Sequence, residues 1–240
     1  MMPTNNAFVL VTRGNNPTAA KPEDPGALKV KALKKGQVTD IASIAPGAGY
    51  GFGPRHVDFH PTKPWMYVSV ERQNQLQMYH LRGVNLDPAP SYVLTTLKEP
   101  GNLRPQQMVG PIHIHPNGHV VYVGNRASGT VERDGKKFAA GGENAVTAFM
   151  IDQSSGEPRP LQAIDTHGYH PRTFSIDPSG RMLVVANLQQ MPVREGDNVT
   201  IQPATLSTYK IGADGRLTYV RSYDIETNDL TQWWSGFARL

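Results

Sequence analysis

Three ionisable residues recur at one position of a repeated sequence pattern. Arg13, Glu71 and Arg126 each lie ten residues after a proline that opens a similar segment. A planar guanidinium binds carboxylate or phosphate through paired hydrogen bonds, and a positioned carboxylate can accept a proton from a reacting group. If the repeats stack side by side, these side chains converge on one pocket. We therefore expect a small anionic ligand there.

Three further residues stand at fixed offsets before those prolines. Arg55 and Arg172 lie six residues before their prolines, and His113 lies three residues before its own. Attack of an activated water molecule on a carbonyl group needs a base, and it needs donors where the carbonyl oxygen gains charge. The candidate catalytic residues are Glu71, Arg126 and His113. The candidate substrate-binding residues are Arg55, Arg172 and Arg13.

Each of these residues also has a structural interpretation. An ion pair between Arg126 and Glu71 would brace neighbouring repeats without any catalysis. Arg172 would bond to backbone carbonyls where a strand begins. His113, on an alternating strand, would be a satisfied core or channel histidine, which is the commoner fate of such a residue.

The repeats that carry these residues span nearly the whole chain. They begin near Pro3, Pro61, Pro116 and Pro178, at intervals of 58, 55 and 62 residues. In each repeat an apolar strand leads into a turn with proline and glycine or asparagine, which favours a tight hairpin. A β-branched strand, a third strand and a more polar fourth strand follow. Four antiparallel strands per repeat predict the blades of an all-β propeller. A β-sandwich is the alternative, but its strands do not usually repeat a four-strand unit.

Three polar insertions interrupt the pattern between the second and third strands of a repeat. They cover residues 14–26, 127–144 and 189–203. We expect them to emerge on one rim of the propeller, because the strands that precede them all end there. Loops gathered on one face of a rigid scaffold are frequent binding elements.

Composition narrows the function classes. The 240 residues include no cysteine and give a formal net charge of +4, with basic residues spread along the chain. Thiolate metal sites and disulfides are therefore excluded, and no histidine grouping predicts a metal ion. We expect no cofactor, no nucleic-acid partner, because no basic stripe is present, and no membrane span, because no apolar run is long enough.

Three blade motifs resemble the propeller-type lactonase family, which includes 6-phosphogluconolactonases and carboxymuconate cyclases. They are GPRHVDFHP (53–61), IHIHPNG (112–118) and HPRTFSIDPSG (170–180), followed by strands ending in Glu71, Arg126 and Asn187. The resemblance implies a seven-bladed propeller. It also implies a site built from Arg55, Glu71 and Arg126, while the family's further histidine, from an upstream blade, has no counterpart here.

The repeat count predicts only about four to five of seven blades, in a single partial propeller domain over residues 1–240. We interpret the chain as an N-terminally truncated member whose first blade lacks its first strand. Uncovered radial faces favour association, so we expect an open arc or a ring completed by a homo-oligomer.

The functional hypothesis is a 6-phosphogluconolactonase-like hydrolase that opens a sugar lactone with activated water and arginine stabilisation. The resemblance implies a role in carbohydrate metabolism and the pentose phosphate pathway, with a small anionic lactone or carboxylate as substrate. We expect a cytoplasmic location, with which the absence of cysteine is compatible. Two alternatives stay open. One is a carboxymuconate cyclase-like intramolecular lyase, and the other is a non-catalytic fragment that binds or assembles.

Overall fold

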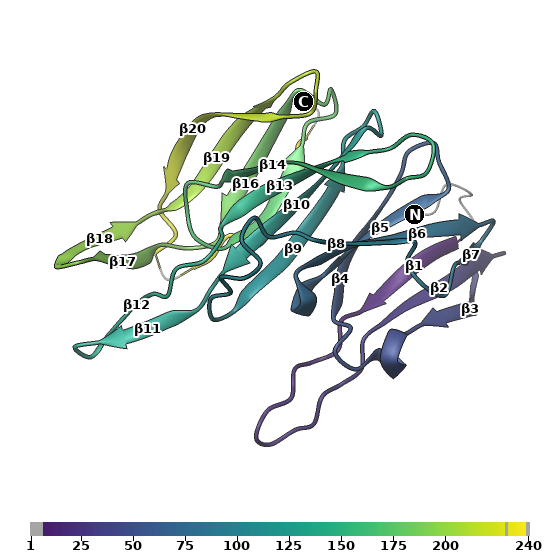
Figure 1. Ribbon diagram of the computed structural model, residues 1–240, viewed down its shortest axis with the longest axis horizontal. Coiled ribbons are helices and arrows are strands. Elements are labelled where there is room, and N and C mark those ends of the chain that lie inside the picture. Colours follow the sequence, from purple (N-terminus) through teal and green to yellow (C-terminus); the bar gives the residue numbers. More distant parts are fainter. Residues whose placement is uncertain (1–6, 229, 239–240) are drawn as a thin grey trace.

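The fold is an open arc of four antiparallel β-sheets (Figure 1). The computed structural model describes residues 7–228 and 230–238, so Pro3 of the first repeat lies outside the described residues. Two short 3₁₀ turns, η1 (Pro46–Gly49) and η2 (Glu71–Gln73), are the helical elements of this part. None of the helices in the described part is long and apolar enough to cross a membrane. The prediction of an all-β, partial propeller is confirmed.

Each repeat forms one sheet whose strands follow each other outward in chain order. The first sheet consists of β1 (Ala7–Thr12), β2 (Ala27–Lys34) and β3 (Gln37–Ile44). The second sheet consists of β4 (Pro54–Phe59), β5 (Trp65–Val70), β6 (Gln75–Arg82), and the short strands β7 (Asn85–Leu86) and β8 (Tyr92–Thr95), which both pair with β6. The first sheet therefore begins with the equivalent of β5.

The third and fourth sheets repeat the full pattern. The third consists of β9 (Gln107–Ile114), β10 (Val120–Ala127), β13 (Ala145–Ile151) and β14 (Pro158–Asp165). The fourth consists of β15 (Pro171–Ile176), β16 (Met182–Asn187), β19 (Ala204–Ile211) and β20 (Leu217–Ile225). The inner strands β4, β9 and β15 contact one another in sequence, so consecutive sheets lie side by side.

The inner strands begin earlier than the apolar pattern predicts. That pattern starts at Val57, Ile112 and Phe174, whereas pairing extends back to Pro54, Gln107 and Pro171. The extra residues pair across a β-bulge, where one residue of the ladder is skipped. Arg55 and Arg172 consequently lie within β4 and β15 and not in the segments before them.

The hydrophobic core lies between the sheets as three separate layers. In β5, Met66, Val68 and Val70 face the first sheet, while Trp65 and Tyr67 face the third. Because both faces are covered, every residue of β5 is buried. A strand buried on both sides reads as a continuous apolar run, which is how the central strands of these repeats read in the sequence.

The three polar insertions emerge on one rim, as predicted (Figure 1). The second and third fold into hairpins, β11–β12 (Thr130–Arg133, Lys136–Ala139) and β17–β18 (Met191–Glu195, Asn198–Gln202). The two hairpins contact each other, and Arg194 Nη1 lies 3.1 Å from Asp134 Oδ2.

Two histidines tie neighbouring sheets together at the opposite rim. His60 Nε2 lies 2.9 Å from the carbonyl oxygen of Gly118, and His115 Nε2 lies 2.8 Å from that of Gly180. The other ring nitrogen, Nδ1, accepts backbone N–H groups, among them Lys63 N at 3.0 Å for His60. Each ring therefore carries its proton on Nε2 and must be neutral to make both sets of bonds.

Replacing His60 by alanine should lower the free energy of unfolding by about 1–3 kcal/mol. The carbonyl of Gly118 would lose one of its two donors, the other being Gln153 Nε2, and the backbone N–H groups of Thr62 and Lys63 would lose their acceptor. Urea unfolding near neutral pH measures this, with the exposed His119→Ala as the matched control. Burial lowers the pKa of His60 below its usual value, so its contribution is present above about pH 6.5 and fades as the pH falls. A difference between wild type and variant that persists unchanged at acidic pH would contradict this account.

Candidate functional site

The site forms where three neighbouring strands end on the rim that carries the insertions. Arg13 follows β1, Glu71 follows β5 and Arg126 lies near the end of β10. Since the sheets stack in register, equivalent positions become spatial neighbours, and the structure brings the three side chains together. Arg55, on the inner strand β4, reaches the same point.

Glu71 is the centre of this group. Its side chain is only 1% exposed, and Arg13 Nη1 donates to its Oε2 at 2.5 Å. Arg126 Nη2 donates to its Oε1, and Arg55 Nη1 lies 3.3 Å from the same oxygen. One carboxylate therefore connects the first, second and third sheets.

Positive charge exceeds negative charge around Glu71. We use the name arginine cluster for Arg13, Arg55, Arg126 and Arg172, whose charges act on one another and on Glu71. Burial alone would raise the pKa of Glu71, but the hydrogen bond from Arg13 and the charges of Arg55 and Arg126 outweigh it and lower the pKa. Burial and the charge of Arg55 lower the pKa of Arg126 to about 10. The carboxylate is therefore ionised and the cluster favours an added anion.

Several buried donors of this cluster have no hydrogen-bond partner within the described residues. They are Nε and Nη1 of Arg126 and Nε of Arg55. Buried donors without partners are costly. A nearby anion would offset part of this cost by its electrostatic attraction to the guanidinium groups of Arg55 and Arg126. The cluster therefore favours binding of an anion beside it.

A glycine lies beside the buried guanidinium of Arg126. Gly110 of β9 holds the position that Arg55 and Arg172 hold in β4 and β15. A Cβ atom on Gly110 would lie 3.4 Å from Cζ of Arg126, an ordinary contact distance, so the guanidinium of Arg126 lies next to Gly110. The inner strands β4 and β15 thus carry arginine at this repeat position, and the inner strand between them, β9, carries glycine.

His170 also belongs to this region, although no pattern of ionisable residues in the sequence pointed to it. Burial and the charges of Arg126 and Arg172 lower the pKa of His170 to about 3, so its ring is neutral. Its φ of +56° is unusual for a residue with a side chain. Gly53 and Gln106 precede the other inner strands with φ of +55°. The one sequence signal for His170 is that it occupies the same repeat position as Gly53, eight residues before the proline.

A pocket of about 240 Å³ opens beside the cluster, and we call it the channel pocket. Its charged and aromatic lining comes from Arg55, His56, His113, Arg172, Trp233 and Trp234. His113 is 46% exposed and its Nδ1 lies 3.8 Å from Asp58 Oδ2. The structure therefore places His113 on the pocket wall, apart from the ion pairs of Glu71.

Arg172 and Arg13 differ in their surroundings. No hydrogen bond from Arg172 to a backbone carbonyl is found in the part of the chain that the structure describes. Its guanidinium lies over the ring of Trp233 instead, 4.2 Å from the ring centre. Arg13 is 39% exposed and contacts Glu71 directly. Arg55 and Arg172 are thus the members of the cluster that line the channel pocket.

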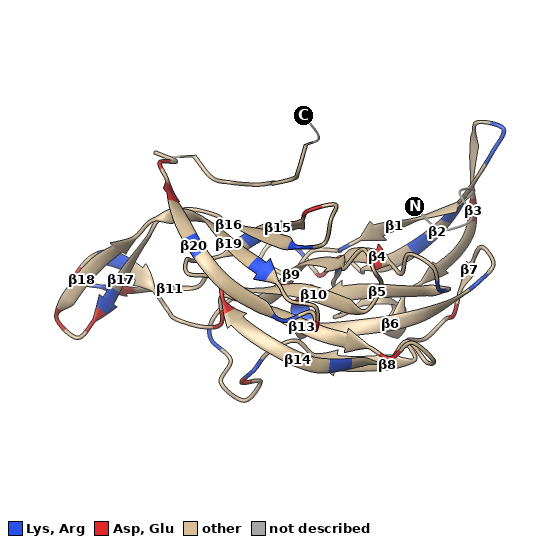
Figure 2. Cartoon of the chain, turned by 90° about the horizontal axis from the view of Figure 1, so that it is seen from above, with Lys and Arg blue, Asp and Glu red and all other residues tan. Residues whose placement is uncertain are grey.

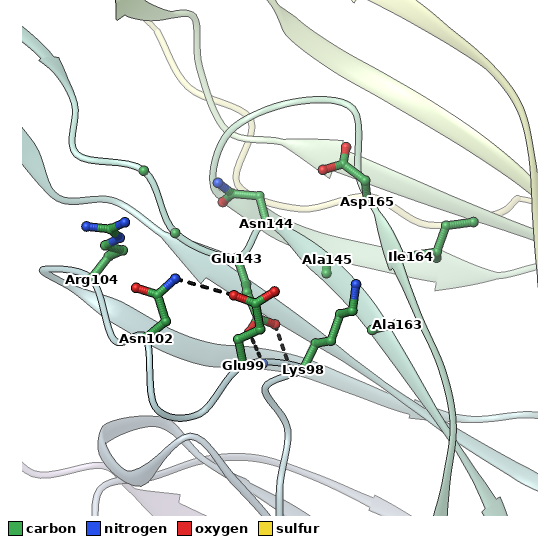
Figure 3. A pocket seen from close by; sticks show the side chains of 12 residues that line it. Lys98, Glu99, Asn102, Arg104, Glu143, Asn144, Ala145, Ala163, Ile164 and Asp165 are labelled. Atoms are coloured by element: carbon green, nitrogen blue, oxygen red, sulfur yellow. Dashed lines mark hydrogen bonds between the residues drawn. The ribbon is translucent and has the colours of Figure 1, made fainter. Parts of the chain in front are cut away.

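A second pocket, of about 370 Å³, lies on the third sheet between the segment 98–104, the segment 141–145 and the end of β14 (Figure 3). Its central carboxylate, Glu143, accepts the backbone N–H groups of Lys98 at 3.0 Å and Glu99 at 2.8 Å. Glu143 therefore braces two loops. In the described ranges, no group of three or more histidine, aspartate or glutamate side chains is placed to hold a metal ion.

Comparison with known proteins identifies the relatives of this chain. The sequence profile described as "Lactonase, 7-bladed beta-propeller" matches residues 32–201. A 6-phosphogluconolactonase of Bacillus subtilis is 28% identical over 183 residues, covering 73% of this chain and 46% of the relative. One from Formosa agariphila is 30% identical over 151 residues, covering 63% and 36%. The chain thus spans less than half the length of these two curated relatives.

Solved structures show the same fold. A protein from Lactobacillus plantarum superimposes with a TM-score of 0.62 at 18% identity, covering 89% of this chain and 55% of that one. The periplasmic gluconolactonase of Pseudomonas aeruginosa gives a TM-score of 0.57 at 16% identity, covering 92% and 68%. The arc of sheets described above is therefore similar to part of these propellers.

Replacing Glu71 by glutamine should lower the free energy of unfolding by about 3 kcal/mol or more, because it leaves buried guanidinium groups without their counter-charge. Chemical denaturation at neutral pH measures the change. Glu157→Gln removes an exposed ion pair with Arg159 and should cost less than about 1 kcal/mol. Equal losses in the two variants would show that the Glu71 ion pairs do not hold the sheets.

Proposed function

Because this chain belongs to the lactonase family of seven-bladed β-propellers, we propose that it serves in the hydrolysis of a small anionic lactone. The observation that carries this proposal is the channel pocket, where Arg55 and Arg172 reach a cavity next to a cluster with an excess of positive charge. The names of the relatives, 6-phosphogluconolactonase in both bacteria, support a phosphorylated sugar lactone as the substrate.

In this proposal Arg55 and Arg172 touch the substrate. Both line the channel pocket. Arg55 extends from β4 and Arg172 from β15, the inner strands that contact β9 from either side. A guanidinium can bind a phosphate through two parallel hydrogen bonds, or stabilise the oxyanion that forms when a carbonyl is attacked. Two such groups facing one cavity suit a substrate with an anionic substituent and a reacting carbonyl.

His113 is the better candidate for the base that activates water. Both carboxylate oxygens of Glu71 are engaged by arginines, and its lowered pKa makes it a weak base. His113 is accessible at the pocket and has Asp58 beside it. A water molecule would give a proton to His113 as its oxygen bonds to the carbonyl carbon. The ring C–O bond then breaks, and the leaving oxygen takes the proton back from His113.

Glu71, Arg126 and Arg13 act through the other residues in this proposal. The side chain of Arg126 is only 2% exposed, so it does not reach the surface of the channel pocket. Its contact with Glu71 fixes the carboxylate that in turn holds Arg55. We therefore propose that these three residues position Arg55 and contribute to the charge around the pocket, while Arg55 and Arg172 contact the substrate directly.

Substituting Arg55 by methionine should reduce kcat/KM for 6-phosphogluconolactone by about a hundredfold, because an oxyanion donor and a binding charge are lost together. The assay records acid release and subtracts the spontaneous hydrolysis seen in buffer. Arg159→Met, on the exposed surface of β14, is the matched control and should keep the wild-type rate.

Turnover that survives in Arg55→Met and Arg172→Met would rule out the channel pocket as the site. A folded wild-type chain that does not exceed the buffer rate would favour the non-catalytic alternative. Cyclisation of a carboxymuconate by the same sample would favour the lyase alternative, since the same arginines fit a dicarboxylate.

We also propose that a second copy of the chain covers the ends of the arc. Exposed large apolar side chains on the first and last sheets support this proposal. They are Leu10, Leu33, Val38, Met182, Tyr219, Val220 and Tyr223. Apolar surface of this kind favours association.

The solution mass tests the association. Light scattering on the purified chain should give about twice the 26.3 kDa of one copy. Substituting Val220 and Tyr223 by serine should shift the mass toward a single copy, since both are exposed on β20. A wild-type mass of one copy at high concentration would contradict the proposal.

A further inference from the structure

The segment 230–238 after the last sheet is fixed to the inner end of that sheet. Gln232 N donates to Leu188 O at 2.9 Å, and Gln232 Nε2 donates to Asn187 O at 2.7 Å. Ser175 Oγ of β15 donates to Ser235 O at 2.7 Å. Figure 2 shows this segment running along one side of the sheets toward the C-terminus. These hydrogen bonds, together with one from Gln232 Nε2 to Thr205 O at 3.4 Å, hold the segment against the fourth sheet.

The segment lies beside β15, the inner strand of the fourth sheet. Asp58 in β4 and Ser175 in β15 hold the same position in the repeat, three residues before the proline. Asp58 Oδ2 accepts the N–H of Ile114 in the next inner strand, β9. Ser175 instead donates from its hydroxyl group to the backbone carbonyl oxygen of Ser235. Through Trp233 and Trp234, the segment 230–238 forms one wall of the channel pocket.

Two tryptophans of this segment are exposed although the backbone around them is held. Trp233 is 62% exposed and Trp234 is 82% exposed, and both line the channel pocket. By contrast, Trp65 packs in the core between two sheets and is 4% exposed. Exposed indole rings beside arginines in a pocket are a costly arrangement for stability alone, and they are well suited to ligand contact.

We propose that Trp233 and Trp234 form a ring-binding subsite that selects a cyclic sugar with an anionic substituent. The inference rests on the proposed function and extends it to substrate specificity. The electron-rich face of an indole attracts the C–H groups of a sugar ring. Trp233 also holds Arg172 over its ring at 4.2 Å. Trp234 then contacts the sugar ring while Arg172, held by Trp233, binds its anionic substituent, and Arg55 adds its charge and faces the reacting carbonyl.

Calorimetric titration with glucose 6-phosphate tests the subsite, because this sugar is cyclic, anionic and not a lactone. Inorganic phosphate serves as the probe for the anion alone. In Trp234→Leu the Kd for glucose 6-phosphate should rise about tenfold, the size of an aromatic stacking contribution, while the Kd for phosphate stays unchanged. In Trp233→Leu both Kd values should rise, because Arg172 loses its support.

Phe237→Leu is the matched control, since Phe237 lies in the same segment, is 42% exposed and does not line the pocket. It should bind both probes as the wild type does. The fluorescence of buried Trp65 reports that each variant is folded.

The inference is overturned if Trp234→Leu binds glucose 6-phosphate as tightly as the wild type, or if the wild type binds phosphate and the sugar phosphate equally. It is also overturned if the folded wild type binds no glucose 6-phosphate. Failure of the proposed function has a different signature. Lactone turnover would then stay at the buffer rate while the tryptophan-dependent preference for the sugar phosphate persists.

Discussion

The buried carboxylate of Glu71 is the interaction on which the site depends. It stands at the end of β5 and receives Arg13 from the first sheet, Arg55 from its own and Arg126 from the third. Such a group is stable only with its partners, because each buried charge loses its hydration. The same contacts leave an excess of positive charge around Glu71. The interaction that joins the sheets thereby also prepares a place for an anion.

The sheets are held at both rims and between their faces. Histidine-to-carbonyl bonds join neighbouring sheets at one rim, and the ion pairs of Glu71 join them at the other. Between the rims, three apolar layers fill the space from sheet to sheet. This fixes the relative position of the inner strands, so Arg55 and Arg172 face one pocket although 117 residues separate them in the chain.

Much of this arrangement could be predicted from the repeats. Equivalent offsets from the prolines predict which residues become neighbours, and the structure indeed brings Arg13, Glu71 and Arg126 together. The offsets could not predict that Arg126 is buried behind the pocket, because burial depends on the packing of neighbouring sheets and not on position in the repeat. His170 and the wall formed by Trp233 and Trp234 also escaped prediction. The contacts of 230–238 follow from three-dimensional packing at the end of the arc and not from the repeat.

Binding of 6-phosphogluconate, the product of the proposed reaction, tests the central claim most directly. Calorimetry on the wild type and on Arg126→Met at equal ionic strength compares an intact cluster with one that has lost a buried charge. Our account predicts one saturable site in the wild type and a Kd at least about tenfold higher in the variant, because hydrogen bonds and charges in a buried network act together. Equal Kd values, or binding that never saturates, would contradict the claim that the arginine cluster forms an anion site.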